Sequence, residues 1–206
     1  MSEAIAPFYY YKENQNIQAS HHNVVNIDIG GGTTDIVVFK QNSPALTSSF
    51  RFAANSILGG KNISNNGFAE KYYPKFEQIL TEMSENFEGI FELEDVISQI
   101  KENNLPEDLI SFFFSLDSHP NIGDNDDLDF ADRLKHDSEL KIVFVVFYAS
   151  IIYYLGRLLN INDIQAPNTI TLSGTGSKII NILNTSANSK GVVALSKLAF
   201  NAGFGS

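Results

Sequence analysis

The sequence predicts an α/β fold, in which a mixed sheet with flanking helices carries an inserted, mainly helical subdomain. Three patterns support this prediction. Residues 23–29 and 35–40 are apolar or β-branched runs of the kind found in strands, and a glycine run separates them. From position 68 onward apolar residues recur every three or four positions, as in helices. Residues 169–178 combine a short β-branched run with a glycine loop, which indicates a strand–loop–helix unit.

The first strands are predicted to form a hairpin. Val25, Ile27 and Ile29 alternate with more polar residues, so one strand is expected to end at Ile29. Three glycines follow, and residues 35–40 resume a strand-like run, which favours an antiparallel hairpin. A third strand is predicted over residues 48–54.

The middle of the chain is predicted to be helical. The helical spacing follows Leu58-Gly-Gly60 and continues to about residue 100, where Asn103-Asn-Leu-Pro106 interrupts it. An acidic stretch at 124–129 ends the region. We therefore predict that residues 1–60 and 138–206 form one core and that residues 61–137 form an inserted helical subdomain.

A long apolar helix is predicted from Ser138 to about Leu159. Its most apolar part, residues 142–156, is shorter than the roughly 20 residues that cross a bilayer, and tyrosines interrupt it. We therefore expect a buried helix and no contact with a membrane. Residues 169–173 are expected to form a short buried strand, followed by a helix, and residues 186–206 show no clear closing element.

Composition narrows the possible functions. The 206 residues are 43% hydrophobic, enough for a globular core, and the formal net charge is −10 with only 14 Lys and Arg. This balance argues against a nucleic-acid partner, because phosphate backbones are bound by clustered basic residues. The absence of cysteine excludes thiolate sites and disulfides. With no signal peptide in the first residues, we expect a cytoplasmic protein.

The glycine run is the strongest candidate site. It lacks GK[ST], has Asp35 in the place of a third spaced glycine, and precedes a strand, so P-loop and Rossmann sites are disfavoured. A glycine turn can still bind phosphate, because backbone N–H groups converge on the anion and Thr33 or Thr34 adds a hydroxyl. Asp28 would repel that phosphate unless a divalent cation such as Mg²⁺ lay between them.

These residues carry a family resemblance. Asp28-Ile-Gly-Gly-Gly-Thr-Thr-Asp35 resembles the second phosphate motif of the actin, Hsp70 and sugar-kinase ATPases, and is most similar to the Hsp70 and bacterial actin-like form. The resemblance implies a ribonuclease H-like sheet. It also implies that Asp28 positions Mg²⁺ or its water, and that the turn holds the ATP phosphates. The residues implied in phosphate contact are Gly30, Gly31, Gly32, Thr33 and Thr34.

Other segments follow in the order that the family requires. Leu58-Gly-Gly60 would open the inserted helices, and its Gly59 and Gly60 would border the nucleotide. Residues 169–178 resemble the adenosine motif, whose contacts would come from Gly174, Thr175, Gly176 and Ser177, with Ser177 starting the next helix. Glu3 resembles the residue that orients the attacking water, although another register would put that glutamate at Met1.

The resemblance implies the second lobe of an ATPase that couples nucleotide state to conformational change. The family's first lobe has no counterpart in these residues, so the chain alone is expected to bind ATP weakly and to turn over negligibly. Chaperone-like client binding and filament assembly are both compatible with the motifs. A non-catalytic scaffold that retains the fold is an alternative, and a sugar-kinase-type phosphotransferase is a third.

Simpler interpretations stay open for several segments. Either glycine run can be an ordinary turn, and Asp35 can cap the hairpin as readily as it can contact a cation. The acidic stretch 124–129 lacks the Gly and Glu positions of a calcium loop, which favours a solvated loop. His21 and His22 have no spaced partners that would indicate a metal site.

Overall fold

The computed structural model describes residues 5, 9, 23–41, 43–59, 67–84, 91–103, 106–116, 129–178, 180 and 190–205. The chain divides into two compact units. The sheet unit comprises residues 1–53 and 142–206, and the helical unit comprises residues 54–141. The sequence prediction placed the corresponding borders at 60/61 and 137/138.

The sheet unit contains four strands in the order β3-β2-β1-β4. They are β1 (Val24–Ile29), β2 (Thr34–Lys40), β3 (Ser43–Phe50) and β4 (Thr169–Ser173). The first three form an antiparallel meander, and β4 pairs parallel to β1. The sheet is therefore mixed, and the predicted α/β class with flanking helices is confirmed at this level. The hairpin between β1 and β2 is also observed.

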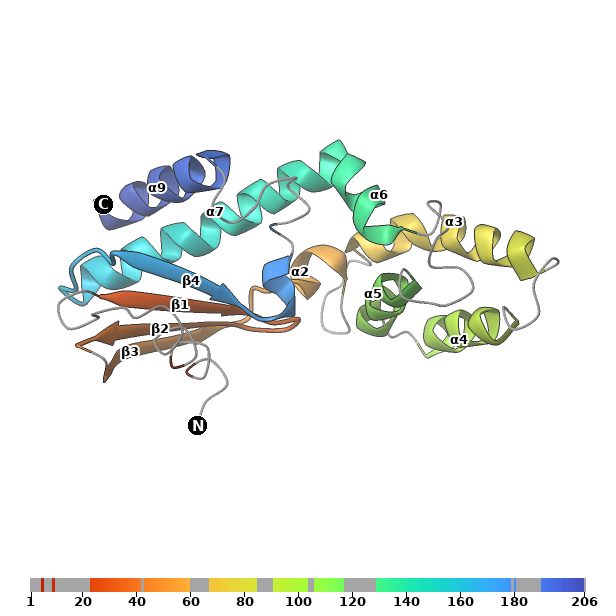
Figure 1. Cartoon of the computed structure of the whole chain (residues 1–206), viewed down its shortest axis with the longest axis horizontal. Helices are drawn as coiled ribbons and strands as arrows, with labels where there is room; N and C mark the ends of the chain where they lie inside the picture. Colours follow the sequence, from red (N-terminus) through yellow and green to blue (C-terminus); the bar gives the residue numbers. More distant parts are fainter. Residues whose placement is uncertain are drawn as a thin grey trace. The chain divides into compact units, whose positions relative to one another are not determined.

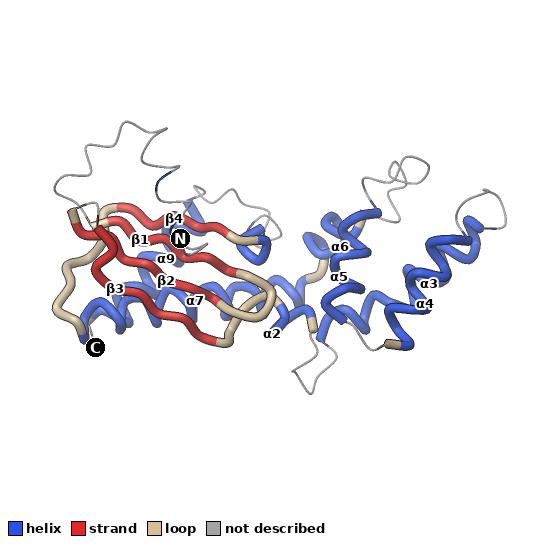
Figure 2. Tube along the Cα trace, turned by 90° about the horizontal axis from the view of Figure 1, so that it is seen from below, coloured by secondary structure: helices blue, strands red, loops and turns tan. Residues whose placement is uncertain are grey.

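Two helices cover one face of this sheet (Figures 1 and 2). They are α7 (Ser138–Ile161), of which the part from Ile142 belongs to the sheet unit, and α9 (Lys190–Phe204). Tyr154 of α7 lies 4.7 Å from Phe50 between ring centres, and its hydroxyl is hydrogen-bonded to Ser48 at 2.9 Å. Strand register places Val25, Ile27 and Ile36 on this helix-covered face, and all three are fully buried.

The opposite face of the sheet changes character along β1. At the amino end of β1, Val24 packs with Val37 and Phe39, and Ile5 lies against them. Towards the carboxyl end of β1 the same face carries Asn26 and then Asp28. The apolar end belongs to the core, whereas the polar end provides the chemistry discussed below.

Several element boundaries differ from the sequence prediction. Strand β3 begins at Ser43 instead of 48, because residues 43–47 are mostly exposed, include Pro44 and show no apolar alternation. Strand β4 has the predicted bounds but is only half buried. Residues 190–204 form the helix α9 where no closing element was expected. After β4 the structure describes a 3₁₀ turn, η5 (Thr175–Lys178), and the helical residue Ile180, and the rest of the helix predicted there lies outside the described residues.

Helix α7 is buried on one side only, so the expectation of a buried helix is corrected in part. Its inner face contains Phe144, Phe147 and Ile151, whereas Ile142 and Val146 are 68% and 60% exposed. By length and composition α7 is the one described helix that could cross a membrane, and 44% of its most apolar window is buried in the structure. The contacts of Phe147 and Tyr154 with residues 50–52 show that α7 packs on the sheet.

Helices α7 and α9 meet at a pair of glycines. A Cβ atom on Gly203 would lie 2.1 Å from the carbonyl oxygen of Tyr153, and one on Gly156 would lie 2.6 Å from that of Phe200. Backbone on both sides fills the space that a side chain would need. Close contact between the helices therefore depends on these two glycines.

Gly203→Ala is expected to destabilise the sheet unit by about 1–3 kcal/mol, because α9 must move away from α7 to admit the methyl group. Thermal unfolding of the full-length protein measures the effect. Gly191→Ala in the same helix is the matched control, since its Cβ would meet nothing within 4 Å. Equal melting temperatures for the two variants would contradict the proposed close contact.

The helical unit has an aromatic core. Its helices are α2 (Asn55–Leu58), α3 (Gly67–Ser84), α4 (Phe91–Glu102), α5 (Pro106–Ser115), α6 (Phe130–His136) and the first turn of α7. Phe76, Phe113 and Phe130 are fully buried and pack against one another with ring centres 4.5–5.6 Å apart. Of the predicted acidic loop, Asp129 is described, and its side chain accepts a hydrogen bond from the Asp132 N–H at the start of α6.

Asp137 forms hydrogen bonds with both α3 and the start of α7. One carboxylate oxygen accepts the Leu140 N–H at 3.0 Å, which caps α7, and the other accepts Lys71 at 2.7 Å and the Tyr72 hydroxyl. Burial would raise the pKa of Asp137, but the donors Lys71, Tyr72 and Leu140 outweigh it and hold the pKa at about 2. A lowered carboxyl pKa stabilises the fold above the ordinary value of 3.8, and the stabilisation is lost as pH falls toward 2.

Asp137→Ala is expected to cost about 1–3 kcal/mol at pH 7, because it removes a helix cap and two further hydrogen bonds. Below pH 2 the variant and the unmutated protein should differ little. Urea unfolding at pH 7 and at low pH measures both values. Glu139→Ala is the control, because Glu139 shares Lys71 but its side chain is 74% exposed. A pH-independent difference would contradict the role assigned to the Asp137 carboxylate.

Candidate functional site

The predicted site residues of the sheet unit gather at one edge of the sheet, where β1 and β4 have their carboxyl ends. Asp28 is the penultimate residue of β1, and its register partner on the parallel strand is Ser173, the last residue of β4. The turn 30–33 leaves β1 at this edge, and the turn that begins with Gly174 leaves β4. Ligands of open α/β sheets bind outside the carboxyl ends of strands, so this edge has the expected location.

The two glycine turns, about 145 residues apart in sequence, touch each other. Gly174 has φ +83°, and a Cβ on it would lie 2.3 Å from Asp28 Oδ1 and 2.3 Å from the Ile29 carbonyl oxygen. A Cβ on Gly176 would lie 2.8 Å from the carbonyl oxygens of Ile29 and Gly30. Glycine is therefore required at both positions to bring the second turn against Asp28 and the hairpin.

The hairpin glycines are in a different situation. Neither Gly30 nor Gly32 has φ in the left-handed region, and a Cβ on Gly32 would meet nothing within 4 Å. The turn closes through the Gly30 N–H, which donates to the Thr33 carbonyl at 2.9 Å. Neither backbone conformation nor packing within the described chain therefore explains why position 32 is glycine.

The two threonines of the motif have different surroundings. Thr34 is fully buried at the start of β2, and its hydroxyl donates to the Phe52 carbonyl at 2.7 Å. Thr33 is exposed, and its hydroxyl lies 3.4 Å from Asp35 Oδ2. A hydroxyl has one proton, and the proton of Thr34 is used in the hydrogen bond to the Phe52 carbonyl. The Thr34 hydroxyl thus has a buried acceptor within the fold, whereas the Thr33 hydroxyl lies at the exposed turn.

Two carboxylates face each other across the hairpin. Asp28 and Asp35 are register partners on β1 and β2, and directly opposed like charges are unfavourable in a sheet. A cation next to them would relieve the repulsion. Among the described residues no group of three or more His, Cys, Asp or Glu could hold a metal. Mg²⁺ commonly takes only one or two carboxylates and completes its shell with waters and phosphate oxygens, so this donor set fits it.

A polar network that the sequence analysis missed lies beside Asp28. Asn26 is fully buried in the central strand, where its Nδ2 donates to Ser173 Oγ at 3.2 Å. The Thr171 hydroxyl lies 2.9 Å from Asn26 Oδ1 and 3.2 Å from the Val25 carbonyl oxygen. The signal in the sequence was a polar residue at a strand position whose neighbours on both sides are apolar.

Ser177 lies within the 3₁₀ turn η5, and most of the helix predicted after it, residues 179 and 181–189, lies outside the described residues. Its hydroxyl and its N–H both contact the Gly174 carbonyl, at 2.7 and 3.2 Å, so it lies inside the 3₁₀ turn instead of capping it. Thr175, in the same turn, is exposed. Gly59 is buried with φ 110° and belongs to the helical unit. Glu3 and Gly60 lie outside the described residues.

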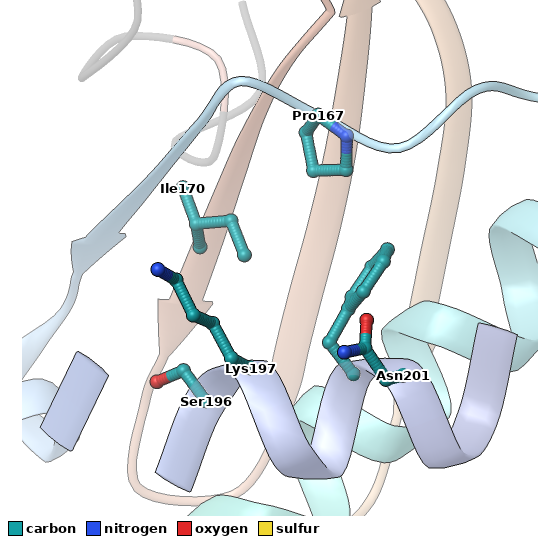
Figure 3. Close-up of a pocket in the computed structure, with 6 residues that line it drawn as sticks. Pro167, Ile170, Ser196, Lys197 and Asn201 are labelled. Atoms are coloured by element: carbon teal, nitrogen blue, oxygen red, sulfur yellow. The ribbon is translucent and has the colours of Figure 1, made fainter. Parts of the chain in front are cut away.

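A small pocket of the sheet unit lies elsewhere (Figure 3). It has a volume of about 140 Å³, is open to solvent, and lies between α9 and the segment leading into β4. Ile170, one of its lining residues, is the register partner of Val25 and so lies on the helix-covered face. The candidate site is on the opposite face, so this pocket is separate from it. The lining residues are Pro167, Ile170, Ser196, Lys197, Phe200 and Asn201.

No protein-family model matches the chain, and no curated protein matches it.

Proposed function

We propose that this chain is the ATP-binding second lobe of an actin-like or Hsp70-like ATPase, with a ribonuclease H-like sheet. The observation that carries the proposal is the contact between the Gly174 turn and the Asp28–Gly30 end of β1. The sequence assigns residues 28–35 to phosphate and residues 169–178 to adenosine on separate grounds. In the structure both segments lie at the carboxyl ends of β1 and β4, with the Asp28 carboxylate between them.

In this proposal each group has one role. Backbone N–H groups of Gly31 and Gly32 and the Thr33 hydroxyl bind the β- and γ-phosphates. Asp28 holds Mg²⁺ or one of its waters, and the bound Mg²⁺ supplies neutralisation of phosphate charge. The open space next to Gly32 supports the proposal, because a phosphate needs close access to the turn. A first lobe supplies the remaining contacts, and Glu3 is the candidate that orients the attacking water in the cytoplasmic, full-length ATPase.

Thermal unfolding of the full-length protein with added nucleotides tests the proposal. A ligand present at 100 times its dissociation constant stabilises the fold by about 2.7 kcal/mol. We expect Mg-ATP and Mg-ADP to raise the melting temperature, and AMP to have little effect because it lacks the β-phosphate. Identical melting curves with and without Mg-ATP would count against the proposal.

An assembly module is the second candidate, and one specific observation favours it. Large apolar side chains are exposed on both covering helices, with Ile142 at 68%, Val146 at 60% and Leu198 at 71%. Ile142 and Val146 lie one turn apart on α7, and neighbouring exposed apolar side chains are typical of surfaces that bind another protein. Sedimentation with and without Mg-ATP distinguishes nucleotide-dependent self-assembly from a monomeric switch that binds a client.

A further inference from the structure

The buried network Asn26–Thr171–Ser173 is unusual for a central strand. Asn26 has no exposed surface, and burying an amide is costly unless its donors and acceptors are satisfied. An apolar side chain at this position would avoid that cost, as Val25 and Ile27 do on either side. The network therefore suggests a requirement beyond stability at this edge of the sheet.

Donor chemistry gives the network a direction. The Asn26 amide nitrogen can only donate, so Ser173 Oγ accepts that hydrogen bond. Asn26 Oδ1 can only accept, and it faces the Thr171 hydroxyl. Ser173 Oγ thus accepts a hydrogen bond from the buried side, and its own O–H is available to donate a second one. Ser173 is half buried at the last position of β4, directly beside Asp28 and just before Gly174.

We propose that Ser173 is a phosphate-binding donor and that Asn26 is the residue that orients it. This inference rests on the proposed nucleotide function and adds a side-chain donor on the β4 side of the same site. The anionic acceptors next to Ser173 in the proposed site are the Asp28 carboxylate and the phosphate oxygens. Asp28 is assigned to Mg²⁺ or its waters, and a water bound to Mg²⁺ donates, so we assign a phosphate oxygen as the acceptor for Ser173. Asn26 does not touch the nucleotide and acts through Ser173.

The test is a set of Mg-ATP titrations of the full-length protein. Ser173→Ala should weaken binding roughly 10-fold, the typical effect of one hydrogen bond to a charged group, and Ser173→Thr should restore most of it. Asn26→Leu should weaken binding by a similar factor. The double variant should bind no more weakly than Ser173→Ala, because Asn26 acts through Ser173. Ser48→Ala, on the opposite face next to Tyr154, is the matched control.

Thermal unfolding of the same variants separates binding from folding. Asn26→Leu leaves the Thr171 hydroxyl with the Val25 carbonyl as its acceptor, so the strand pairing can persist. Ser173→Ala removes the acceptor of the buried Asn26 amide and should melt below the unmutated protein, whereas Ser173→Thr keeps that acceptor and should melt close to it.

Unchanged Mg-ATP affinity in Ser173→Ala, with binding by the unmutated protein, would overturn this inference and leave the proposed function intact. Additive losses in the double variant would overturn the orienting role of Asn26. Absence of Mg-ATP binding by the unmutated protein would overturn both the function and the inference.

Discussion

Gly174→Ala is expected to lower the free energy of unfolding by about 2–5 kcal/mol and to abolish Mg-ATP binding. The left-handed φ of +83° costs a non-glycine residue roughly 1–2 kcal/mol. In addition, the methyl group would lie 2.3 Å from both Asp28 Oδ1 and the Ile29 carbonyl, and relieving such overpacking costs about 1–3 kcal/mol. The expected structural change separates β4 and its turn from the end of β1.

Denaturant unfolding and Mg-ATP titration of the same preparation measure both effects. Gly32→Ala is the matched control for stability, because it places the same methyl group in the facing turn where nothing lies within 4 Å. If Gly174→Ala and Gly32→Ala proved equally stable, the close contact between the two turns would be wrong.

Asp28→Ala is expected to weaken Mg-ATP binding by roughly 30–100-fold, equivalent to about 2–3 kcal/mol. In the proposed site the variant removes the carboxylate assigned to Mg²⁺ or its water, so less positive charge would offset the repulsion between the phosphates and the remaining carboxylate, Asp35. In excess EDTA no cation separates the Asp28 carboxylate from the phosphates, so the variant should bind ATP no more weakly than the unmutated protein.

Calorimetric titrations with Mg²⁺ and with EDTA make this comparison. Asp163→Asn removes one negative charge from the same unit at the opposite edge of the sheet, in the connection from α7 to β4, and should bind Mg-ATP as the unmutated protein does. An equal loss in Asp28→Ala with and without Mg²⁺ would show that Asp28 acts independently of a cation.

The sequence predicted those parts of the fold that local patterns determine. Alternation gave the hairpin of β1 and β2, because its inward residues are apolar on a regular period of two. The alternation does not predict that β4 pairs parallel to β1, because this pairing depends on packing between segments about 140 residues apart. Helix α9 was missed because Gly191 and Gly203 weaken a helical pattern, and Gly203 is explained only by its contact with α7.

The candidate site was predictable to a similar extent. The residue types alone identified the glycine turn and Asp28 as a candidate phosphate site, because glycine lets backbone N–H groups approach an anion. The different roles of Thr33 and Thr34 depend on strand register, which sends the Thr34 hydroxyl to the Phe52 carbonyl. The Asn26 network was missed because a polar residue in an alternating strand is ordinarily assigned to the solvent face, whereas Asn26 is fully buried.

An equilibrium titration of the full-length protein with Mg-ATP, alongside Gly32→Val, tests the central claim most directly. The valine side chain enters open space next to the turn, so the variant should fold and melt like the unmutated protein. We predict saturable binding of one Mg-ATP by the unmutated protein and its loss in Gly32→Val, because the side chain occupies the phosphate position. No binding by the unmutated protein, or equal binding by both, would contradict the account.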